Sequence, residues 1–398
     1  MPREQPPLNV AVVGAGIGGL TAALALGAAG HSVTVVERRT GFSEVGAGLQ
    51  ISPNASRVLA GLGLAAALRR AASEPPGVTV RALGSGRRIG AVALGGRARE
   101  RFGAPYYVIH RADLQTLLLD AVRARPGIRL MVGRAVTGLT ETADAVTLAL
   151  ESGNGARGDS LSADLVLGAD GLRSRIRGHL DPRPLASAGM AAWRAIVPRE
   201  AVPEDLAGEA TGLWLGRGRH VVHYPIHGGR DLNVVAIVPE RQGDEDWGRL
   251  GEPAVLRAHF RDSAPALVEL LSLPDSWLVW SLAARPVARP IARGRVALIG
   301  DAAHPVLPFL AQGAALAIED CAVLARCLAD RPVLDALAAY AGLRKRRVRR
   351  VQRAARANGR TYHAGGLTAF VRDAVMARLG PDGMRERYAW LYGWTPDA

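Results

Sequence analysis

A glycine-rich loop between an apolar strand and a helix opens the chain and limits its fold more than any other feature. Residues 8–13 form a short apolar run typical of a buried parallel strand, and the pattern Gly14-x-Gly16-x-x-Gly19 follows directly. A helix and a second strand are predicted next, at residues 20–29 and 33–36. This order predicts a βαβ unit of the kind that binds dinucleotides.

The spacing of the glycines has a physical reason. The first glycine permits a tight turn, and the second lets a pyrophosphate approach the backbone at the positive N-terminus of the helix. Glu37 ends the second strand, about 20 residues on, where a carboxylate accepts hydrogen bonds from both ribose hydroxyls. NAD and FAD both fit this pattern, and a tight turn without a ligand is the alternative.

Composition excludes several classes of protein. With 398 residues and about 150 residues per domain, two to three domains are expected. A hydrophobic share of 48% and a charged share of 22% exclude a disordered or fibrous chain. The net charge of +14 allows nucleic acid, an acidic membrane surface or anionic small molecules as partners, and does not choose among them.

The cysteines and the first apolar segment indicate where the protein works. Cys321 and Cys327 are six residues apart, which matches neither a redox pair nor a zinc site, so we expect two buried thiols on a helix and no metal. Residues 8–29 are long enough to cross a bilayer, but the glycines inside them argue against a membrane span or a signal peptide. We therefore expect a cytoplasmic protein.

The rest of the chain alternates between two kinds of sequence pattern. Parallel-type strands are predicted at 165–168 and 295–299, strands around a polar turn at 128–132 and 145–150, and helices at 108–125, 314–328 and 344–360. Separated strands with turn residues between them, typical of an antiparallel sheet, are predicted at 190–197, 212–215, 220–226, 232–238 and 277–282, with a hairpin within 78–94.

These two patterns predict an α/β fold in which a Rossmann-like nucleotide-binding domain is interrupted by an antiparallel β-sheet domain and followed by C-terminal helices. The predicted nucleotide-binding domain comprises residues 1–76, 101–181 and 285–343, the inserted sheet domain residues 77–100 and 182–284, and the helical tail residues 344–398.

Two further acidic residues follow predicted strands. Asp170 begins the motif Asp-Gly-Leu-Arg-Ser-Arg-Ile-Arg, and Asp301 begins Asp-Ala-Ala-His-Pro. Asp301 is placed to accept a polyol hydroxyl, and the helix that begins near Gly313 offers free N–H groups to an anionic ring or a phosphate. A simple dehydrogenase needs one such strand end, whereas several that are far apart in the sequence suit a long cofactor such as FAD.

Together these motifs resemble a known family. The set GxGxxG, DGxxSxxR and GDAAHPxxPxxAQG is similar to the single-component FAD-dependent aromatic hydroxylases, in particular to the branch with salicylate hydroxylase, 3-hydroxybenzoate 6-hydroxylase and 6-hydroxynicotinate 3-monooxygenase. The motifs stand in the family's order. The resemblance covers nearly the whole chain, including residues 44–50 (EVGAGLQ) and 390–393 (WLYG).

The resemblance implies a set of FAD contacts. Glu37 would hold the adenosine ribose, Arg111 the ribose-phosphate region and Asp301 the ribityl chain, while Asp170 would lie where the family contacts FAD and the pyridine nucleotide. The full implied cofactor set is Gly14, Gly16, Gly19, Glu37, Arg38, Arg111, Asp170, Asp301, Pro308, Ala311, Gly313 and Ala314. Many relatives have glycine where this chain has Ala311, although alanine also occurs in the salicylate-like branch.

The resemblance also implies the reaction. NADH or NADPH reduces the flavin, O2 adds to give a flavin C4a-hydroperoxide, and its distal oxygen attacks an electron-rich ring. A phenol is best activated by losing its proton, so a histidine is the natural base. His220 and Tyr224 share one face of a predicted strand, and a similarly spaced pair contacts substrate in the 6-hydroxynicotinate enzyme. Both are the candidate catalytic residues; a histidine bonded within the sheet is the alternative for His220.

The expected substrate contacts are Gln50, His220, Tyr224 and Pro308. Gln50 stands where the 6-hydroxynicotinate enzyme has histidine, which argues against an identical substrate; an ordinary loop glutamine is the alternative. We expect His304 to be structural. Arg194 is either a cation for a substrate carboxylate or, as the favoured alternative, a surface arginine. The arginines at 346, 349, 350 and 353 are expected on a solvated helix face.

The sequence therefore predicts an FAD monooxygenase that hydroxylates a phenolic or heteroaromatic acid with NAD(P)H and O2. A flavin monooxygenase for a bulkier quinolone or polyketide phenol is the alternative, and a non-enzymatic nucleic-acid binder, which depends on charge alone, is a remote one. No nucleic-acid partner is expected, and a monomer and a homodimer are both open.

Overall fold

The computed structural model describes residues 6–42, 48–152, 157–240 and 248–396. Its first large sheet has six strands in the order β18-β19-β11-β1-β2-β7 and is parallel except for the pair β18–β19. The strands are β1 (Asn9–Val13), β2 (Ser32–Glu37), β7 (Ile128–Val132), β11 (Leu165–Gly168), β18 (Ala292–Arg293) and β19 (Val296–Leu298). The carboxyl ends of β1, β2, β11 and β19 therefore meet at one edge.

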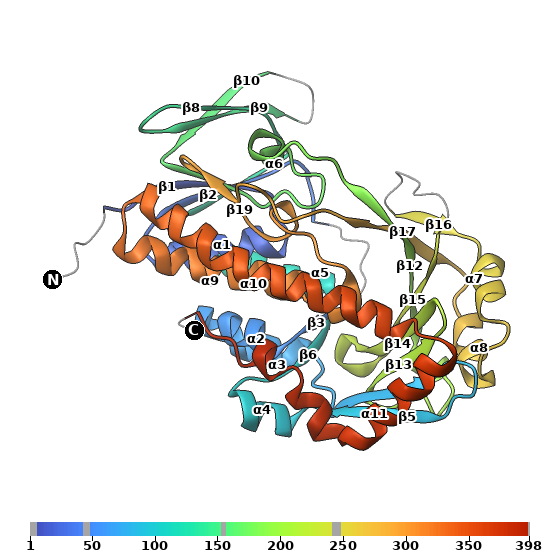
Figure 1. Ribbon diagram of the computed structural model, residues 1–398. Helices are drawn as coiled ribbons and strands as arrows, with labels where there is room; N and C mark the ends of the chain where they lie inside the picture. Colours follow the sequence, from blue (N-terminus) through green and yellow to red (C-terminus); the bar gives the residue numbers. More distant parts are fainter. Residues whose placement is uncertain (1–5, 43–47, 153–156, 241–247, 397–398) are drawn as a thin grey trace.

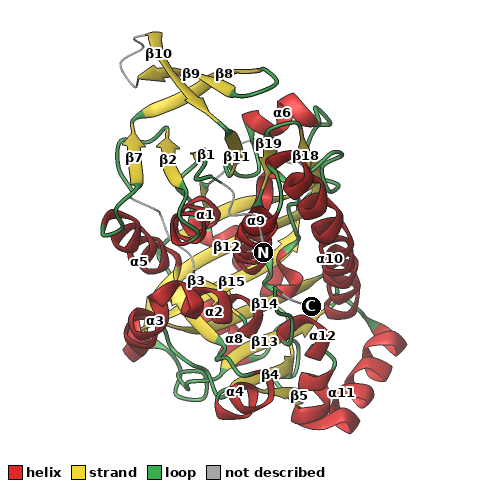
Figure 2. Ribbon diagram, turned by 90° about the vertical axis from the view of Figure 1, so that its left-hand side faces the viewer, coloured by secondary structure: helices red, strands yellow, loops and turns green. Residues whose placement is uncertain are grey.

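Different structures cover the two faces of this sheet (Figures 1 and 2). On one face lie the helices α1 (Ile17–Ala28), α5 (Arg111–Arg123) and α9 (Gly313–Asp330), against which α10 (Val333–Tyr362) packs. On the other face lies a three-stranded sheet of β8 (Arg134–Glu141), β9 (Val146–Ser152) and β10 (Arg157–Ala163), drawn in green at the top of Figure 1. Apolar residues of these layers form the largest core.

The second large sheet has eight strands in the order β16-β17-β12-β15-β14-β13-β4-β5. It is antiparallel except that β4 runs parallel to β13. Its strands are β4 (Gly77–Ala82), β5 (Arg88–Ala93), β12 (Ala186–Pro198), β13 (Thr211–Gly216), β14 (Arg219–Ile226), β15 (Asp231–Pro239), β16 (Arg249–Gly251) and β17 (Trp277–Ala284). This is the predicted inserted sheet, including its hairpin.

Shorter elements complete the molecule. Helices α7 (Pro253–Phe260) and α8 (Pro265–Ser272) share a core with the eight-stranded sheet, and α11 (Gly366–Glu386) packs on β5. The remaining elements are β3 (Gly48–Ile51), β6 (Tyr107–His110), α2 (Pro53–Leu59), η1 (Ala60–Leu64), α3 (Ala65–Ala71), α4 (Gly96–Phe102), α6 (Arg175–Leu180), η2 (Arg199–Ala201), η3 (His227–Gly229), η4 (Gly300–Ala302), η5 (Pro308–Leu310) and α12 (Ala389–Tyr392).

The α/β fold class is confirmed, and three local predictions are corrected. The helix expected from residue 108 begins at Arg111, because residues 107–110 form β6 and pair with β3. The segments 128–132 and 145–150 do not flank a single turn, since β8 lies between them and they belong to different sheets. The basic helix expected at 344–360 is the second half of the longer α10.

The structure bears on two other expectations. Cys321 and Cys327 are buried free thiols on α9, as predicted. Among the described residues, no helix combines the length and the apolar character that a membrane crossing requires. The division into domains stays a prediction; α10 runs across the boundary expected at residue 344.

Candidate active site

A large cavity lies where the two main sheets meet. Its volume is about 680 Å³, and its walls come from the strand ends of the six-stranded sheet and from one face of the eight-stranded sheet. Most of the residues predicted from the sequence line it, namely Gly14, Gly16, Glu37, Arg38, Gln50, Arg111, Asp170, His220, Tyr224, Asp301, Pro308, Ala311, Gly313 and Ala314. Positions that are far apart in the chain are thus brought to one space.

The glycine loop is shaped by its own backbone. Gly14 has φ of +105°, and a Cβ there would stand 2.6 Å from the carbonyl oxygen of Ala169. Gly19 does not line the cavity; its Cβ would lie 1.9 Å from the Gly14 oxygen, so it lets helix and loop pack together. By contrast, no atom lies within 4 Å of a Cβ at Gly16. Space for a pyrophosphate therefore adjoins the N-terminus of α1, which has no side-chain cap.

Glu37 closes the loop from the end of β2. Its Oε2 accepts a hydrogen bond from the Ala15 N–H at 2.8 Å, and its Oε1 accepts one from the Arg39 N–H at 2.9 Å. These bonds fix the carboxylate at the cavity wall, where both oxygens keep further lone pairs for the hydroxyls of a ribose.

Asp170 supplies a direct sign that a donor belongs in the cavity. Its Oδ2 accepts from the N–H groups of Arg175 and Ile176 at 2.7 and 3.2 Å. Its Oδ1 is buried with no partner among the described residues, and burial raises the pKa of the carboxyl group. Because a buried acceptor without a donor is costly, a hydroxyl-bearing ligand fits this position.

The second cofactor-facing end is built from η4 and the start of α9. Asp301 lies on η4 and lines the cavity, and burial among protein atoms raises the pKa of its carboxyl group. The first turn of α9 begins at Gly313 without a side-chain cap, so its N–H groups are available to a ligand. Ala311 adopts a left-handed backbone, with φ of +52°, just before this helix.

Side chains that the sequence did not single out hold this loop in place. The Asn54 side chain donates to Oε1 of Gln312 at 3.2 Å and to Oε1 of Glu319 at 2.6 Å. Gln312 in turn donates to Oγ of Ser52 at 2.9 Å. All four side chains are buried, and a sequence signal for them is lacking because they come from segments about 260 residues apart.

A buried charge network supports the loop that carries Asp301. Asp320 accepts from the Gly300 N–H at 2.8 Å, pairs with Nε2 of His304 at 2.7 Å and accepts from Nε of Arg344 at 2.6 Å. His304 is structural, as expected, although its partner is a carboxylate. The basic helix is not solvated throughout, because Arg344 is buried in this network. Of the four arginines expected on a solvated face, Arg346, Arg350 and Arg353 are exposed and Arg349 is half-buried.

The other half of the cavity is formed by β14 together with β12 and β15. His220, Val222 and Tyr224 line it, while His223 lies on the opposite face near Trp214, as strand alternation predicts. Nδ1 of His220 is 2.8 Å from Nε2 of His363. Burial, with a contribution from His363, lowers the pKa of His220 to about 3, so its imidazole is neutral at physiological pH.

Tyr224 approaches β3, the strand that also carries Gln50. A Cβ at Gly48 would stand 2.4 Å from Cε2 of Tyr224, so this glycine permits the close approach. Burial raises the pKa of the Tyr224 phenol and keeps it protonated. Gln50 lies on β3 and not in a plain loop, and its Oε1 accepts from the Tyr106 hydroxyl at 2.6 Å. Residues 44–47 of the EVGAGLQ motif lie outside the described residues.

Arg194 is not a surface arginine, which corrects the favoured sequence interpretation. It lines the cavity from β12, and its guanidinium carbon lies 4.3 Å from the centre of the Trp280 ring. In the sheet, Arg194 pairs with Val235, which pairs with Val222 between His220 and Tyr224. Burial lowers the pKa of Arg194 to about 10, so it remains a cation at neutral pH on the same wall as the two candidate catalytic residues.

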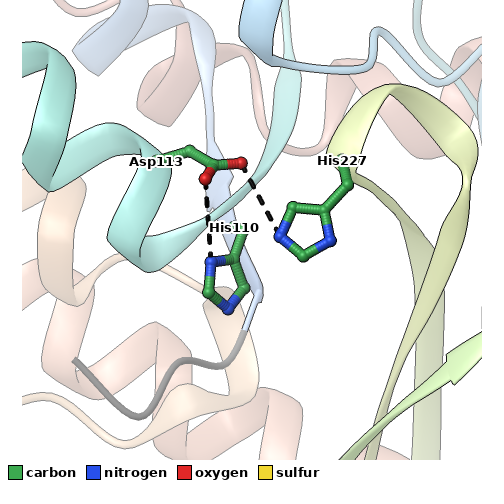
Figure 3. Close-up of side chains that lie close together, drawn as sticks. All are labelled: His110, Asp113 and His227. Carbon is green, nitrogen blue, oxygen red and sulfur yellow. Dashed lines mark ion pairs between the residues drawn. The ribbon is translucent and has the colours of Figure 1, made fainter. Parts of the chain in front are cut away.

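A separate polar cluster joins the two halves of the protein outside the cavity. His110 and His227 face opposite oxygens of Asp113, at N···O distances of 4.0 and 3.8 Å (Figure 3). His227 also pairs with Asp231 at 2.7 Å. The ligand atoms of the three residues in Figure 3 lie within 4.8 Å of one another, and the pairs have ion-pair separations. That no metal binds to the protein stays a prediction.

The two halves of the cavity do different chemistry. One half offers two helix N-termini and three acidic strand ends spread along a groove, which suits a long nucleotide with a polyol chain and a ring system. The other half presents a neutral histidine, a phenol and a cation among the apolar side chains of Val222, Val235 and Ile237. This combination defines a flavin-dependent hydroxylase of aromatic compounds.

Comparison with known proteins gives the family. The pattern of the FAD binding domain family matches residues 7–357, and the chain belongs to this family. It is 34% identical over 393 residues to 3-hydroxybenzoate 6-hydroxylase of Klebsiella oxytoca, with 98% of both chains covered. It is 39% identical over 400 residues to 3-amino-4-hydroxybenzoate 2-monooxygenase of Streptomyces cremeus, with 98% of this chain and 97% of the relative covered.

Solved structures agree with the sequence relatives. A substrate complex of salicylate hydroxylase superposes with a TM-score of 0.81 at 25% identity, over 98% of this chain and 96% of the other. HpxO of Klebsiella pneumoniae, complexed with FAD and uric acid, has a TM-score of 0.81 at 27% identity, over 96% and 95% of the two chains. The predicted family and FAD as cofactor are confirmed. The protein is an FAD-dependent monooxygenase, which replaces the non-enzymatic interpretation.

Proposed function

We propose that this enzyme hydroxylates a phenolic or heteroaromatic acid, with NADH or NADPH and O2 as cosubstrates. The observation that carries the proposal is the half-buried cation of Arg194 on the wall that also bears His220 and Tyr224. A substrate carboxylate at Arg194 would turn the ring so that a hydroxyl reaches His220. The polar groups on β12 and β14, with the apolar residues of β15 between them, match an aromatic acid with groups at both ends.

Each side chain would have one task. Arg194 would bind the carboxylate through charge-assisted hydrogen bonds, and its stacking on Trp280 fixes the direction of the guanidinium group. Tyr224, held protonated by burial, would donate to a substrate oxygen. His220 would take the phenolic proton at Nε2, because its Nδ1 is engaged by His363. Val222, Val235 and Ile237 would exclude water from the ring.

FAD, when bound, supplies the transfer of one oxygen atom from O2 to the ring, with electrons from a nicotinamide. The residues that would hold it are the members of the predicted cofactor set that line the cavity, which excludes Gly19. Glu37 would bind a ribose, Asp170 a hydroxyl donor and Asp301 the polyol chain. The start of α9 would face the ring system. The unpartnered Oδ1 of Asp170 and the open space at Gly16 support this assignment.

The names of the relatives support an acid as substrate. The 3-hydroxybenzoate, 3-amino-4-hydroxybenzoate and 6-hydroxynicotinate enzymes all act, by name, on aromatic acids that carry a hydroxyl group. Gln50 stands at the position where the resemblance gives the 6-hydroxynicotinate enzyme a histidine. This difference favours a benzoate over a hydroxynicotinate as the substrate. A bulkier quinolone or polyketide phenol remains the second candidate, and it would not need the charge of Arg194.

The test is product analysis after aerobic turnover. FAD-loaded enzyme is given NADH or NADPH and a panel of hydroxybenzoates, aminohydroxybenzoates and hydroxynicotinates, with benzoates that lack the hydroxyl and amides that lack the acid as controls. We expect faster nicotinamide oxidation and a product 16 mass units heavier only with the hydroxy acids, or a decarboxylated phenol if carbon dioxide is lost. Products from neutral bulky phenols alone would contradict the proposal.

We also propose the three-part division of the chain given above, a cytoplasmic location and a monomeric or homodimeric state. The two free buried cysteines support a reducing compartment. Size-exclusion chromatography with light scattering of the FAD-loaded protein tests the oligomeric state.

A further inference from the structure

His220 is in contact with a second histidine that the proposed chemistry has not used. His363 follows the last turn of α10, 143 residues further along the chain, and its Nε2 lies 2.8 Å from Nδ1 of His220. Backbone bonds fix the segment, since the His363 N–H donates to the Gly359 carbonyl at 3.1 Å and the Gly218 N–H donates to the His363 carbonyl at 3.1 Å. The backbone bonds therefore keep the His363 imidazole in contact with the His220 imidazole.

The pair connects the cavity with the outside of the protein. His220 is 3% exposed and lines the cavity, whereas His363 does not line the cavity and is only half-buried. Phe309 lies 5.6 Å from the His220 ring and 5.5 Å from the His363 ring, and the Tyr362 ring lies 5.4 Å from His220. These rings pack around the N···N contact, which links the cavity-lining His220 to a side chain that is partly exposed.

The low pKa of both rings limits how a proton can move. Burial lowers the pKa of His220 to about 3 and that of His363 to about 4. A cationic His220 would thus be a costly product of phenol deprotonation. Two neutral imidazoles in a hydrogen bond have another option, because each ring carries one proton and can exchange which nitrogen bears it.

We propose that His363 is the outer member of a two-histidine relay that carries the phenolic proton from the cavity to solvent. At the start, His220 Nδ1–H donates to His363 Nε2, and His363 carries its own proton on Nδ1. The phenol O–H bond breaks as an N–H bond forms at His220 Nε2. The Nδ1 proton of His220 passes to His363 Nε2, and the Nδ1 proton of His363 leaves to water. Both rings end neutral with exchanged tautomers, and the phenolate stays in the cavity.

This inference depends on the proposed function, because it assumes a phenolic substrate at His220. Charge then balances without a buried imidazolium ion. The phenolate left behind would lie beside His220 and Tyr224, on the cavity wall that also carries Arg194. Three ionisable side chains near this segment, in the part of the chain that the structure describes, have contacts away from the two imidazoles. Tyr362 accepts at its hydroxyl from Asn358, Arg372 donates to the carbonyls of Thr361 and Tyr362, and the stem of Arg217 lies against Gly365.

The first test needs no substrate. In FAD-loaded enzyme labelled with ¹⁵N-histidine, NMR should detect a scalar coupling between the two ring nitrogens and neutral rings for both histidines down to about pH 5. In His363→Asn the coupling disappears, and His220 keeps the tautomer with its proton on Nδ1, since the asparagine oxygen accepts that proton. Absence of the coupling in the wild type, or titration of His363 near its ordinary pKa of about 6.5, overturns the relay.

The second test uses the fastest substrate of the hydroxybenzoate panel. His363→Asn keeps an acceptor for His220 but cannot pass a proton on, so we expect kcat/KM at pH 7 to fall about 10²-fold, within the usual range for general acid–base catalysis. The loss should shrink as the pH rises toward the substrate's own phenolic pKa, because the phenolate then arrives deprotonated. Added imidazole should restore part of the activity of His363→Ala.

Tyr362→Phe is the matched control, because it keeps the ring beside His220 and leaves both histidines in place. It should retain a wild-type pH profile. If His363→Asn is as active as the wild type, or if its loss does not respond to pH and His363→Ala does not respond to imidazole, the relay is wrong while the proposed function stands. A wild type that hydroxylates no phenol of the panel contradicts the proposed function instead, whatever the NMR coupling shows.

Discussion

The two halves of the cavity present their ligand-binding groups in different ways. On the six-stranded sheet, ligand groups are backbone N–H donors at helix starts and carboxylates at strand ends, placed by glycines whose Cβ atoms would collide with neighbouring backbone. On the eight-stranded sheet, the working groups are side chains on alternate positions of inner strands, held by packing. A backbone-built site is fixed by local geometry, whereas a side-chain-built site is free to vary while the sheet stays the same.

The same contrast explains what the sequence could predict. The glycine loop, Glu37, Asp170 and Asp301 were predictable because each is set by its neighbours in the chain and by a strand end. The common face of His220 and Tyr224 followed from strand alternation alone. Arg194 was misjudged, since whether its position on β12 faces solvent or the cavity depends on how the inserted sheet docks. His363 gave no signal, because its contact spans 143 residues.

The prediction with the largest expected effect tests whether the cofactor half really depends so little on side chains. Asp320 lies beneath the Asp301 loop and pairs with both His304 and Arg344 in the interior. Asp320→Asn removes one partner of a buried charge network, so we expect the free energy of unfolding at pH 7 to fall by about 3–5 kcal/mol. Chemical denaturation followed by circular dichroism measures it.

The pH dependence of this loss has a definite sign. Burial raises the pKa of Asp320, but the charges of His304 and Arg344 and the hydrogen bonds outweigh it and hold the pKa below its ordinary value. The stabilisation is therefore present above the unfolded-state value of about 3.9 and is lost as the pH falls through the folded-state pKa. The difference between wild type and Asp320→Asn should shrink below pH ~4. Asp330→Asn, on the same helix but exposed, should cost under about 1 kcal/mol.

A pair of glycine substitutions separates folding from cofactor binding within the loop. Gly19→Ala places a methyl group 1.9 Å from the Gly14 carbonyl oxygen, so the backbone must move and stability should fall by about 3 kcal/mol, at the upper end for overpacking. Gly16→Ala meets no protein atom within 4 Å and should leave stability unchanged. Its methyl group fills the space assigned to the pyrophosphate, so FAD affinity should still fall.

Thermal unfolding of the apo proteins and FAD titration by flavin fluorescence distinguish these outcomes. If Gly16→Ala binds FAD as tightly as the wild type, the pyrophosphate does not lie against this part of the loop. If Gly19→Ala is as stable as the wild type, the close packing of loop and helix has been overestimated.

Arg194→Gln tests the side-chain half without touching the backbone. Removing a charged hydrogen-bond donor should cost about 1.5–3 kcal/mol of substrate binding, which is a rise in KM of about 10–150-fold for a hydroxy acid. The FAD dissociation constant should not change, and the preference for the acid over its amide should disappear. Steady-state kinetics on the acid and the amide measure this. An unchanged KM for the acid would show that the carboxylate binds elsewhere.

The smallest expected effect on stability concerns Ala311, a non-glycine residue with a strained backbone in the cofactor half of the cavity. Ala311 has φ of +52°, a left-handed conformation that costs a non-glycine residue about 1–2 kcal/mol. Ala311→Gly relieves this strain but gives the unfolded chain more freedom, worth about 0.4–1 kcal/mol, so stability should rise by about 1 kcal/mol or less. Ala322→Gly, in the interior of α9 where no strain is relieved, should instead lose about 1 kcal/mol. Chemical denaturation of both variants measures their free energies of unfolding. If Ala311→Gly loses as much stability as Ala322→Gly, the backbone at Ala311 is not strained. The shape of the loop that faces the flavin is then set by the bonds of the Ser52, Asn54 and Gln312 side chains.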